Sequence, residues 1–186
     1  LAHEAALAGA HPQLNELMAL GPEAWQALRH GLFALLQDGA EGEAVQALRG
    51  CLTPQVAVEY TLPVRVANYT DFYTSIHHAR NVGQFIRPDE PLTPNFQWLP
   101  IAYHGRASSV VVSGTAFHRP WGQALPPGAS APVHGPCARL DYELEMVIYV
   151  GPGNALGEPV PLAQAEGHIF GMGLLNDWSA RDHQFW

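Results

Sequence analysis

Basic residues and cysteines are scarce in this chain of 186 residues, and long apolar runs are missing. Only 9 residues are Lys or Arg, against 17 Asp and Glu, and the formal net charge is -8. Without a basic cluster the chain cannot displace counterions from a phosphate backbone, so we do not expect nucleic acid as a partner. No apolar run approaches the roughly 20 residues of a membrane-spanning helix, so we expect no membrane segment.

The cysteines, Cys51 and Cys137, are too few for a disulfide framework, and nothing in the sequence requires an oxidising compartment. We interpret each as a small buried apolar residue rather than a nucleophile. No signal peptide is visible, and a cytoplasmic location is the expectation. The chain begins with Leu1 rather than Met, so a preceding segment that carries a targeting signal stays an open alternative.

Charged residues make up only 14% of the chain, whereas Gly (18) and Pro (16) are abundant, which is typical of short strands joined by shaped turns. Residues 1–52 form an exception, because their apolar positions recur at helical spacing behind Gly21-Pro22. From Pro54 onward the pattern predicts strands at 56–60, 109–113, 142–150 and 168–175, and one short helix at 162–167. The predicted fold class is therefore mostly β (α+β), with a helical layer over 1–52 leading into a β domain over 53–186.

The segment 141–150 carries an unusual pair of acids. Glu143 and Glu145 are two apart in a strand-like alternation, so both carboxylates lie on one face, while Leu144, Met146, Ile148 and Val150 form an opposite face that we expect to be packed. Adjacent like charges repel unless a cation or a shared proton compensates. A solvated acidic face is the alternative.

Polar residues also cluster at 68–80, where Asp71, His77 and His78 accompany two tyrosines. Asp71 could instead cap the following turn, and either histidine could be a satisfied buried residue. A second cluster, 100–108, contains Tyr103, with Gly105 allowing the backbone to turn or to approach a ligand.

The last cluster, 176–186, follows the apolar run 169–175 and places Asp177 at an expected strand end. Arg181 and Gln184 are three apart, on what would be one helical face. A capping role for Asp177 is the alternative.

Together Asp71, Glu143, Glu145 and Asp177 offer four carboxylates with no accompanying Cys or His pattern for zinc. Oxygen-only ligation selects Ca²⁺ or Mg²⁺, and Arg181 is the available cation for a site that would stay net negative. A noncatalytic β module that binds Ca²⁺ for stability is an alternative from another class. A glycosidase is disfavoured, because glutamates two apart on one strand are too close to flank a glycosidic bond.

Several longer segments resemble the fumarylacetoacetase family, and the resemblance spans residues 53–186 and fits the preceding helices. The matching segments are YTDFY (69–73), HA with NVG (78–79, 81–83), YHGRASSVVVSG (103–114), ELE (143–145), GPGN with LGEP (151–154, 156–159), and HIFG running into NDWSARD (168–171, 176–182). The segment YHGRASSVVVSG is far more specific than the acidic pattern, which the wider superfamily shares.

The resemblance implies a metal-dependent hydrolase with a β-roll catalytic domain that cleaves 4-fumarylacetoacetate, a β-diketo acid, into fumarate and acetoacetate. It implies Asp71, Glu143, Glu145 and Asp177 as ligands of Ca²⁺ or Mg²⁺, and His78 as the base that activates water. It further implies Arg181 and Gln184 at the oxyanion, and a substrate pocket lined by Tyr73, Arg87 and Tyr103. Another acylpyruvate hydrolase or decarboxylase of the superfamily would share the acidic residues.

The resemblance also implies homodimers and a longer chain, with a barrel domain before Leu1 and a further catalytic portion after Trp186. We therefore expect residues 1–186 alone to be inactive and a poor independent fold, with unpaired strand edges and an open apolar face.

Overall fold

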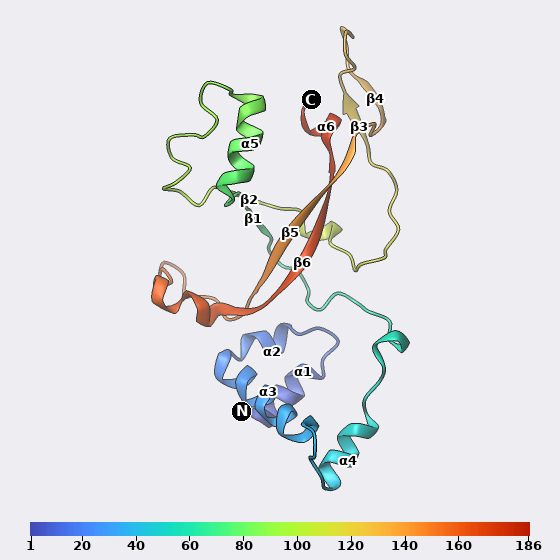
Figure 1. Ribbon diagram of the computed structural model, residues 1–186, viewed down its shortest axis with the longest axis vertical. Helices are drawn as coiled ribbons and strands as arrows, with labels where there is room; N and C mark the ends of the chain where they lie inside the picture. Colours follow the sequence, from blue (N-terminus) through green and yellow to red (C-terminus); the bar gives the residue numbers. More distant parts are fainter. The chain divides into compact units, whose positions relative to one another are not determined.

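The computed structural model describes residues 1–186, which form two compact units. The larger unit comprises Leu1–Val64 and Ser113–Trp186, and the smaller unit comprises Arg65–Val112. Figure 1 shows the elements along the chain. Helical residues outnumber strand residues, so the architecture is a mixture of α and β rather than mostly β as predicted. None of the helices combines the length and apolar character required to cross a membrane.

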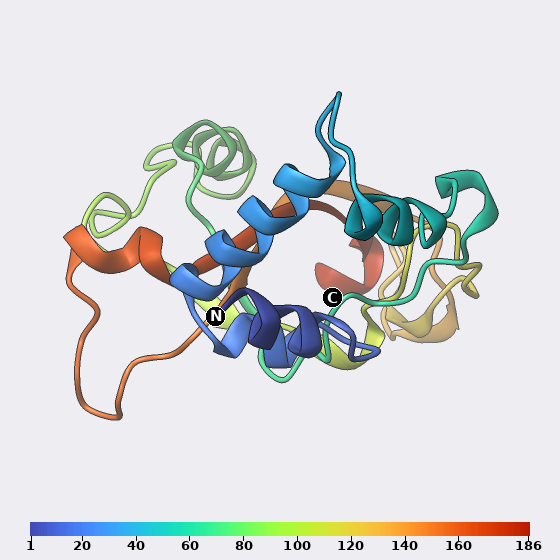
Figure 2. The same ribbon diagram turned by 90° about the horizontal axis from the view of Figure 1, so that it is seen from below.

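The N-terminal part of the larger unit is helical, as the sequence predicts. It contains α1 (Ala2–Gly9), α2 (Asn15–Ala19), α3 (Pro22–Leu36) and α4 (Glu43–Gly50), with α1 beside α3 (Figure 2). The start of α3 follows from its sequence: Gly21 adopts a φ of 83°, open to glycine without strain, and Pro22 occupies the first helical turn, where its missing N–H costs nothing.

A small core joins these helices to the following sheet. Ala5, Leu17 and Ala24 are buried, and Trp25 packs against them. The indole Nε1 of Trp25 donates a 2.7 Å hydrogen bond to the Leu17 carbonyl, which satisfies the polar end of the ring. Its ring meets Phe170 edge to face at 5.0 Å, so the helical layer and the long ribbon share one cluster.

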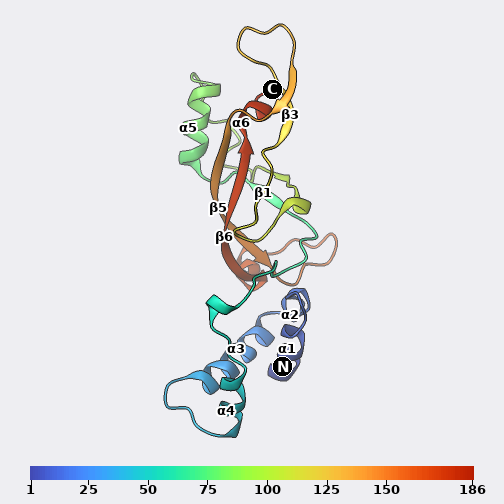
Figure 3. The same ribbon diagram turned by 90° about the vertical axis from the view of Figure 1, so that its right-hand side faces the viewer.

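The β part of the larger unit consists of two antiparallel pairs. Strands β3 (Trp121–Ala124) and β4 (Val133–Pro136) form a short hairpin, and β5 (Leu140–Val150) and β6 (Ile169–Ala180) form a long ribbon (Figure 3). A 3₁₀ helix, η3 (Leu162–His168), precedes β6, and α6 (Arg181–Gln184) follows it. The strand at 142–150 and the short helix at 162–167 are thus confirmed, while the predicted strand at 168–175 extends five residues further, to Ala180.

The apolar face of the β5–β6 ribbon is open, contrary to the expectation that it is packed. Leu144 is 74% exposed and Leu174 on the partner strand is 72% exposed. Alternation does place these side chains on the other face of the ribbon from the glutamates, but no second layer of structure covers that face.

The smaller unit contains the antiparallel pair β1 (Thr70–Phe72) and β2 (Ala102–His104), and the helix α5 (Ile76–Ile86).

Two predicted strands are wrong: 56–60 contains part of the 3₁₀ turn η1 (Gln55–Ala57), and 109–113 begins at the last residue of the 3₁₀ turn η2 (Ala107–Ser109). Their β-branched residues favour strands, but neither segment has a neighbouring strand to pair with. Cys137 is buried as expected, whereas Cys51 is exposed.

Candidate active site

The acidic centre of the larger unit is built by the register of β5 and β6. Glu143 lies directly opposite Asp177, and Glu145 is two residues further along the same face. Carboxylate oxygens of Glu145 and Asp177 approach within 4.8 Å of one another. Asp177 lies inside β6 rather than at the end of a strand, and Ala180 rather than Asp177 is the N-cap residue of α6. The alternation predicted for the glutamates is confirmed, because both are less exposed than their neighbours on the other face.

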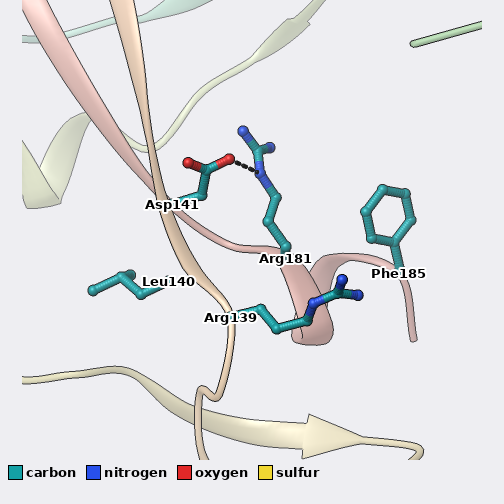
Figure 4. A pocket seen from close by; sticks show the side chains of 5 residues that line it. All are labelled: Arg139, Leu140, Asp141, Arg181 and Phe185. Carbon is teal, nitrogen blue, oxygen red and sulfur yellow. Dashed lines mark hydrogen bonds and ion pairs between the residues drawn. The ribbon is translucent and has the colours of Figure 1, made fainter. Parts of the chain in front are cut away.

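Arg181 supplies the positive charge beside these acids. Its Nε donates to Asp141 Oδ2 at 3.1 Å and its Nη1 to Glu143 Oε1 at 3.0 Å, and Figure 4 shows the Asp141 pair. Nη1 also reaches Gln184 Oε1 at 3.1 Å, which confirms that Arg181 and Gln184 share one face of α6. Burial alone would lower the pKa of Arg181, but its bonds to Asp141 and Glu143 outweigh burial and raise it, so the guanidinium stays charged.

Asp141 and Ser179 belong to the same arrangement, although sequence reasoning missed both. Ser179 Oγ donates a 2.6 Å hydrogen bond to Glu143 Oε1. The Tyr142 N–H and the Arg181 guanidinium hold the pKa of Asp141 below its usual value. The strand alternation could have identified Asp141, which is two residues before Glu143, whereas Ser179 needs the cross-strand register that pairs it with Asp141.

A shallow pocket of about 380 Å³ opens beside this centre (Figure 4). Arg139, Leu140, Asp141, Arg181 and Phe185 line it. Two guanidinium groups against one carboxylate leave the pocket lining positive, so it suits an anionic group better than a cation.

In the smaller unit, Asp71 lies on β1 directly opposite Tyr103 on β2. The Tyr103 hydroxyl donates a 2.6 Å hydrogen bond to Asp71 Oδ2. Asp71 is therefore not a helix cap. Ser75 has that role, since its Oγ accepts from the backbone N–H of His78 at 3.3 Å and so fixes the first turn of α5.

His78 lies in this first turn with its ring edge-on to Tyr73, 5.4 Å between centroids. Tyr73 in turn meets Phe96 edge-on at 5.9 Å. His77 precedes His78 by one residue, and successive side chains of a helix diverge by about 100°. The two histidines therefore point to different surroundings, and only His78 contacts the tyrosine.

Tyr73 and Arg87 line a groove of about 260 Å³ between α5 and the segment that follows it. Burial raises the pKa of Tyr73, and Arg87 only partly opposes this, so its hydroxyl stays neutral and can donate a hydrogen bond. The apolar walls include Phe96 and Ile101. A charged fork beside a neutral donor suits a carboxylate-bearing ligand.

Gly105 packs closely against Tyr69, whereas the sequence predicts a turn or close approach to a ligand at this glycine. Its N–H donates to the Tyr69 carbonyl at 2.6 Å, and an added Cβ would come within 2.5 Å of the Tyr69 ring. The missing side chain of Gly105 therefore permits its backbone to lie against the Tyr69 ring.

The predicted site residues are thus divided between the units. The larger unit brings together Glu143, Glu145, Asp177, Arg181 and Gln184, and the smaller unit brings together Asp71 with Tyr103, and Tyr73 with His78 and Arg87. The catalytic and ligand roles of all of them stay predictions.

Two family models together match nearly the whole chain. The family model described as fumarylacetoacetate (FAA) hydrolase C-terminal matches residues 67–186, and the model described as fumarylacetoacetase N-terminal matches residues 1–63. The chain belongs to the fumarylacetoacetate hydrolase family. The junction between the two matched regions, at 63–67, falls near the start of the smaller structural unit.

Curated relatives of this member of the fumarylacetoacetate hydrolase family are named fumarylacetoacetase. The bovine and human proteins are each 51% identical over 178 residues, and the Caenorhabditis elegans protein is 50% identical over 177 residues. These alignments cover 94%, 94% and 93% of the chain but 42% of each relative. The chain therefore spans about two fifths of the length of the relatives it matches.

The Ser75 cap yields a first prediction, to be measured on the full-length gene product. Ser75→Ala should speed amide exchange in the first turn of α5 by about fivefold, because losing an N-cap costs ~1 kcal/mol. Hydrogen exchange followed by mass spectrometry measures this. Ser130→Ala, in the exposed loop between β3 and β4, is the matched control and should leave α5 unchanged. Equal exchange in α5 for both variants would show that Ser75 does not stabilise the turn.

Proposed function

We propose that the protein is a metal-dependent hydrolase that cleaves the carbon–carbon bond of 4-fumarylacetoacetate, giving fumarate and acetoacetate. Membership of the family, together with the facing register of Glu143 and Asp177 on β5 and β6, carries this proposal. The water oxygen joins the fumaryl carbonyl carbon, the bond from that carbon to the neighbouring methylene breaks, and the departing carbon takes up a proton. One proton is released in addition, when the new fumarate carboxyl group ionises.

By resemblance, Asp71, Glu143, Glu145 and Asp177 would hold the divalent cation. All four are carboxylates, and an all-oxygen set fits Ca²⁺ or Mg²⁺ better than zinc or copper. Ser179 and Arg181 already bond Glu143 Oε1, which orients that carboxylate and offsets its charge. When bound, such an ion polarises a carbonyl oxygen of a β-diketone.

The remaining residues have distinct roles in this proposal. His78 takes a proton from water, while the Tyr73 ring limits where its imidazole can turn. Arg181 and Gln184 donate hydrogen bonds to the developing oxyanion. Arg87, Tyr73 and Tyr103 bind the substrate, with Arg87 pairing with a carboxylate and Tyr73 donating from its neutral hydroxyl.

The test is a hydrolysis assay on the full-length gene product with 4-fumarylacetoacetate and a panel of acylpyruvates. We expect turnover of 4-fumarylacetoacetate in excess of the panel, its loss on adding a chelator, and recovery with Ca²⁺ or Mg²⁺. Preference for a simple acylpyruvate would favour another hydrolase of the superfamily. Metal binding without turnover of any of these substrates would favour a structural Ca²⁺ module.

A further inference from the structure

Asp182 follows Arg181 in α6 and makes two hydrogen bonds to a distant segment. Its Oδ1 accepts from the Cys137 thiol at 2.9 Å, and its Oδ2 accepts from the Ala138 N–H at 2.7 Å. Cys137 is 1% exposed, so one of these bonds reaches a buried donor. Both oxygens of the carboxylate are thus engaged by residues 44 or 45 positions away in the sequence.

The segment that receives Asp182 is itself fixed. The Cys137 N–H donates to the Pro120 carbonyl at 2.8 Å, and Arg119 Nη1 donates to the Cys137 carbonyl at 2.8 Å. These bonds tie the approach to β5 to the residues just before β3. Asp182 is therefore attached to an anchored part of the larger unit rather than to a loose loop.

The anchoring has a direct consequence for Arg181. Its backbone N–H donates to the Arg139 carbonyl at 2.9 Å, while Asp182 holds the next residue to Cys137 and Ala138. Helix α6 has only 4 residues and cannot stabilise itself, since helix nucleation is unfavourable at that length. These bonds therefore fix the backbone position of Arg181, from which its guanidinium reaches Asp141 and Glu143.

We propose that Asp182 is a positioning residue for Arg181: its carboxylate fixes α6 to the Cys137–Ala138 segment and so sets the Arg181 guanidinium beside Glu143. The role in catalysis rests on the proposed function, in which Arg181 stabilises the oxyanion. The Cys137 thiol and the Ala138 N–H both hold the pKa of Asp182 below its usual value. The carboxylate is therefore ionised at neutral pH and offers an acceptor to each donor.

Kinetics of the full-length gene product test this through a double-mutant cycle. Asp182→Ala should lower kcat for 4-fumarylacetoacetate by about 30-fold while KM changes less than about twofold, because a misplaced donor affects the transition state more than ground-state binding. In an Arg181→Ala background the same change should lower kcat less than about twofold further. A full, multiplicative loss in that background would overturn the proposal.

Asp182→Asn is the second variant and guards against misfolding, because the amide has the same shape and keeps one acceptor oxygen. We expect it to lose less activity than Asp182→Ala. Asp38→Ala, at an exposed position just after α3, is the matched control and should keep wild-type kcat. Wild-type kcat in Asp182→Asn and Asp182→Ala alike would overturn the proposal.

A second readout separates this inference from the proposed function. In the wild type the Arg181 Nε–H is bonded to Asp141, so its NMR signal, assigned by its loss in Arg181→Lys, should exchange slowly with water. Asp182→Ala should accelerate that exchange at least about tenfold, whether or not the protein hydrolyses 4-fumarylacetoacetate. If the wild type is inactive, the proposed function fails while this signal still decides the positioning role. An unchanged exchange rate in Asp182→Ala would contradict the role.

Discussion

Glu145→Ala in the full-length gene product is expected to lower kcat/KM for 4-fumarylacetoacetate by about three orders of magnitude and to weaken metal binding strongly. Losing the cation removes several kcal/mol of charge stabilisation from the transition state, and each ~1.4 kcal/mol is a factor of ten in rate. Asp177→Ala should have an effect of the same order, because its carboxylate oxygen lies within 4.8 Å of one from Glu145. Calorimetric titration with Ca²⁺ and with Mg²⁺ measures the binding, and a coupled assay measures the rate.

Glu41→Ala is the matched control, since it removes an exposed carboxylate from the turn before α4. It should change neither metal affinity nor rate. Unaltered metal affinity in both Glu145→Ala and Asp177→Ala would mean that the ion binds elsewhere. A change in rate alone would then indicate that these carboxylates act on the substrate directly.

The ribbon that carries the acids could be predicted because its signals are local. The alternation within 142–150 places Glu143 and Glu145 on one face without any knowledge of neighbouring strands. The sequence predicts too short a partner strand, because the polar residues Asn176 and Asp177 resemble the start of a loop. In the structure both residues continue β6, because their backbone groups pair with β5. This backbone pairing does not depend on whether the side chain is polar.

The failures have a shared physical cause. The β-branched residues at 56–60 and 109–113 predict strands, but such residues form a strand only where a neighbouring strand pairs with them. The Arg181–Asp141 pair and the Asp182–Cys137 bond join residues about 40 positions apart. A local sequence pattern does not specify such contacts, because they depend on how distant segments of the chain fold against one another.

His78→Ala should lower kcat about 10²- to 10⁴-fold with little change in metal affinity, because it removes proton transfer in the transition state rather than a ligand. The matched control is His77→Ala, one residue earlier on the same helix and with the same change in composition. It should retain wild-type kcat, since His78 rather than His77 has its ring against Tyr73.

Single-turnover rates for both variants, with metal titrations alongside, separate the two possible roles of His78. Loss of the chemical step with normal metal binding is the outcome expected of a general base. Loss of metal binding in His78→Ala would instead make the imidazole a ligand, which the all-carboxylate donor set argues against. A larger drop in kcat for His77→Ala than for His78→Ala would place the base on the other face of α5, and the role proposed for the Tyr73 ring would fail with it.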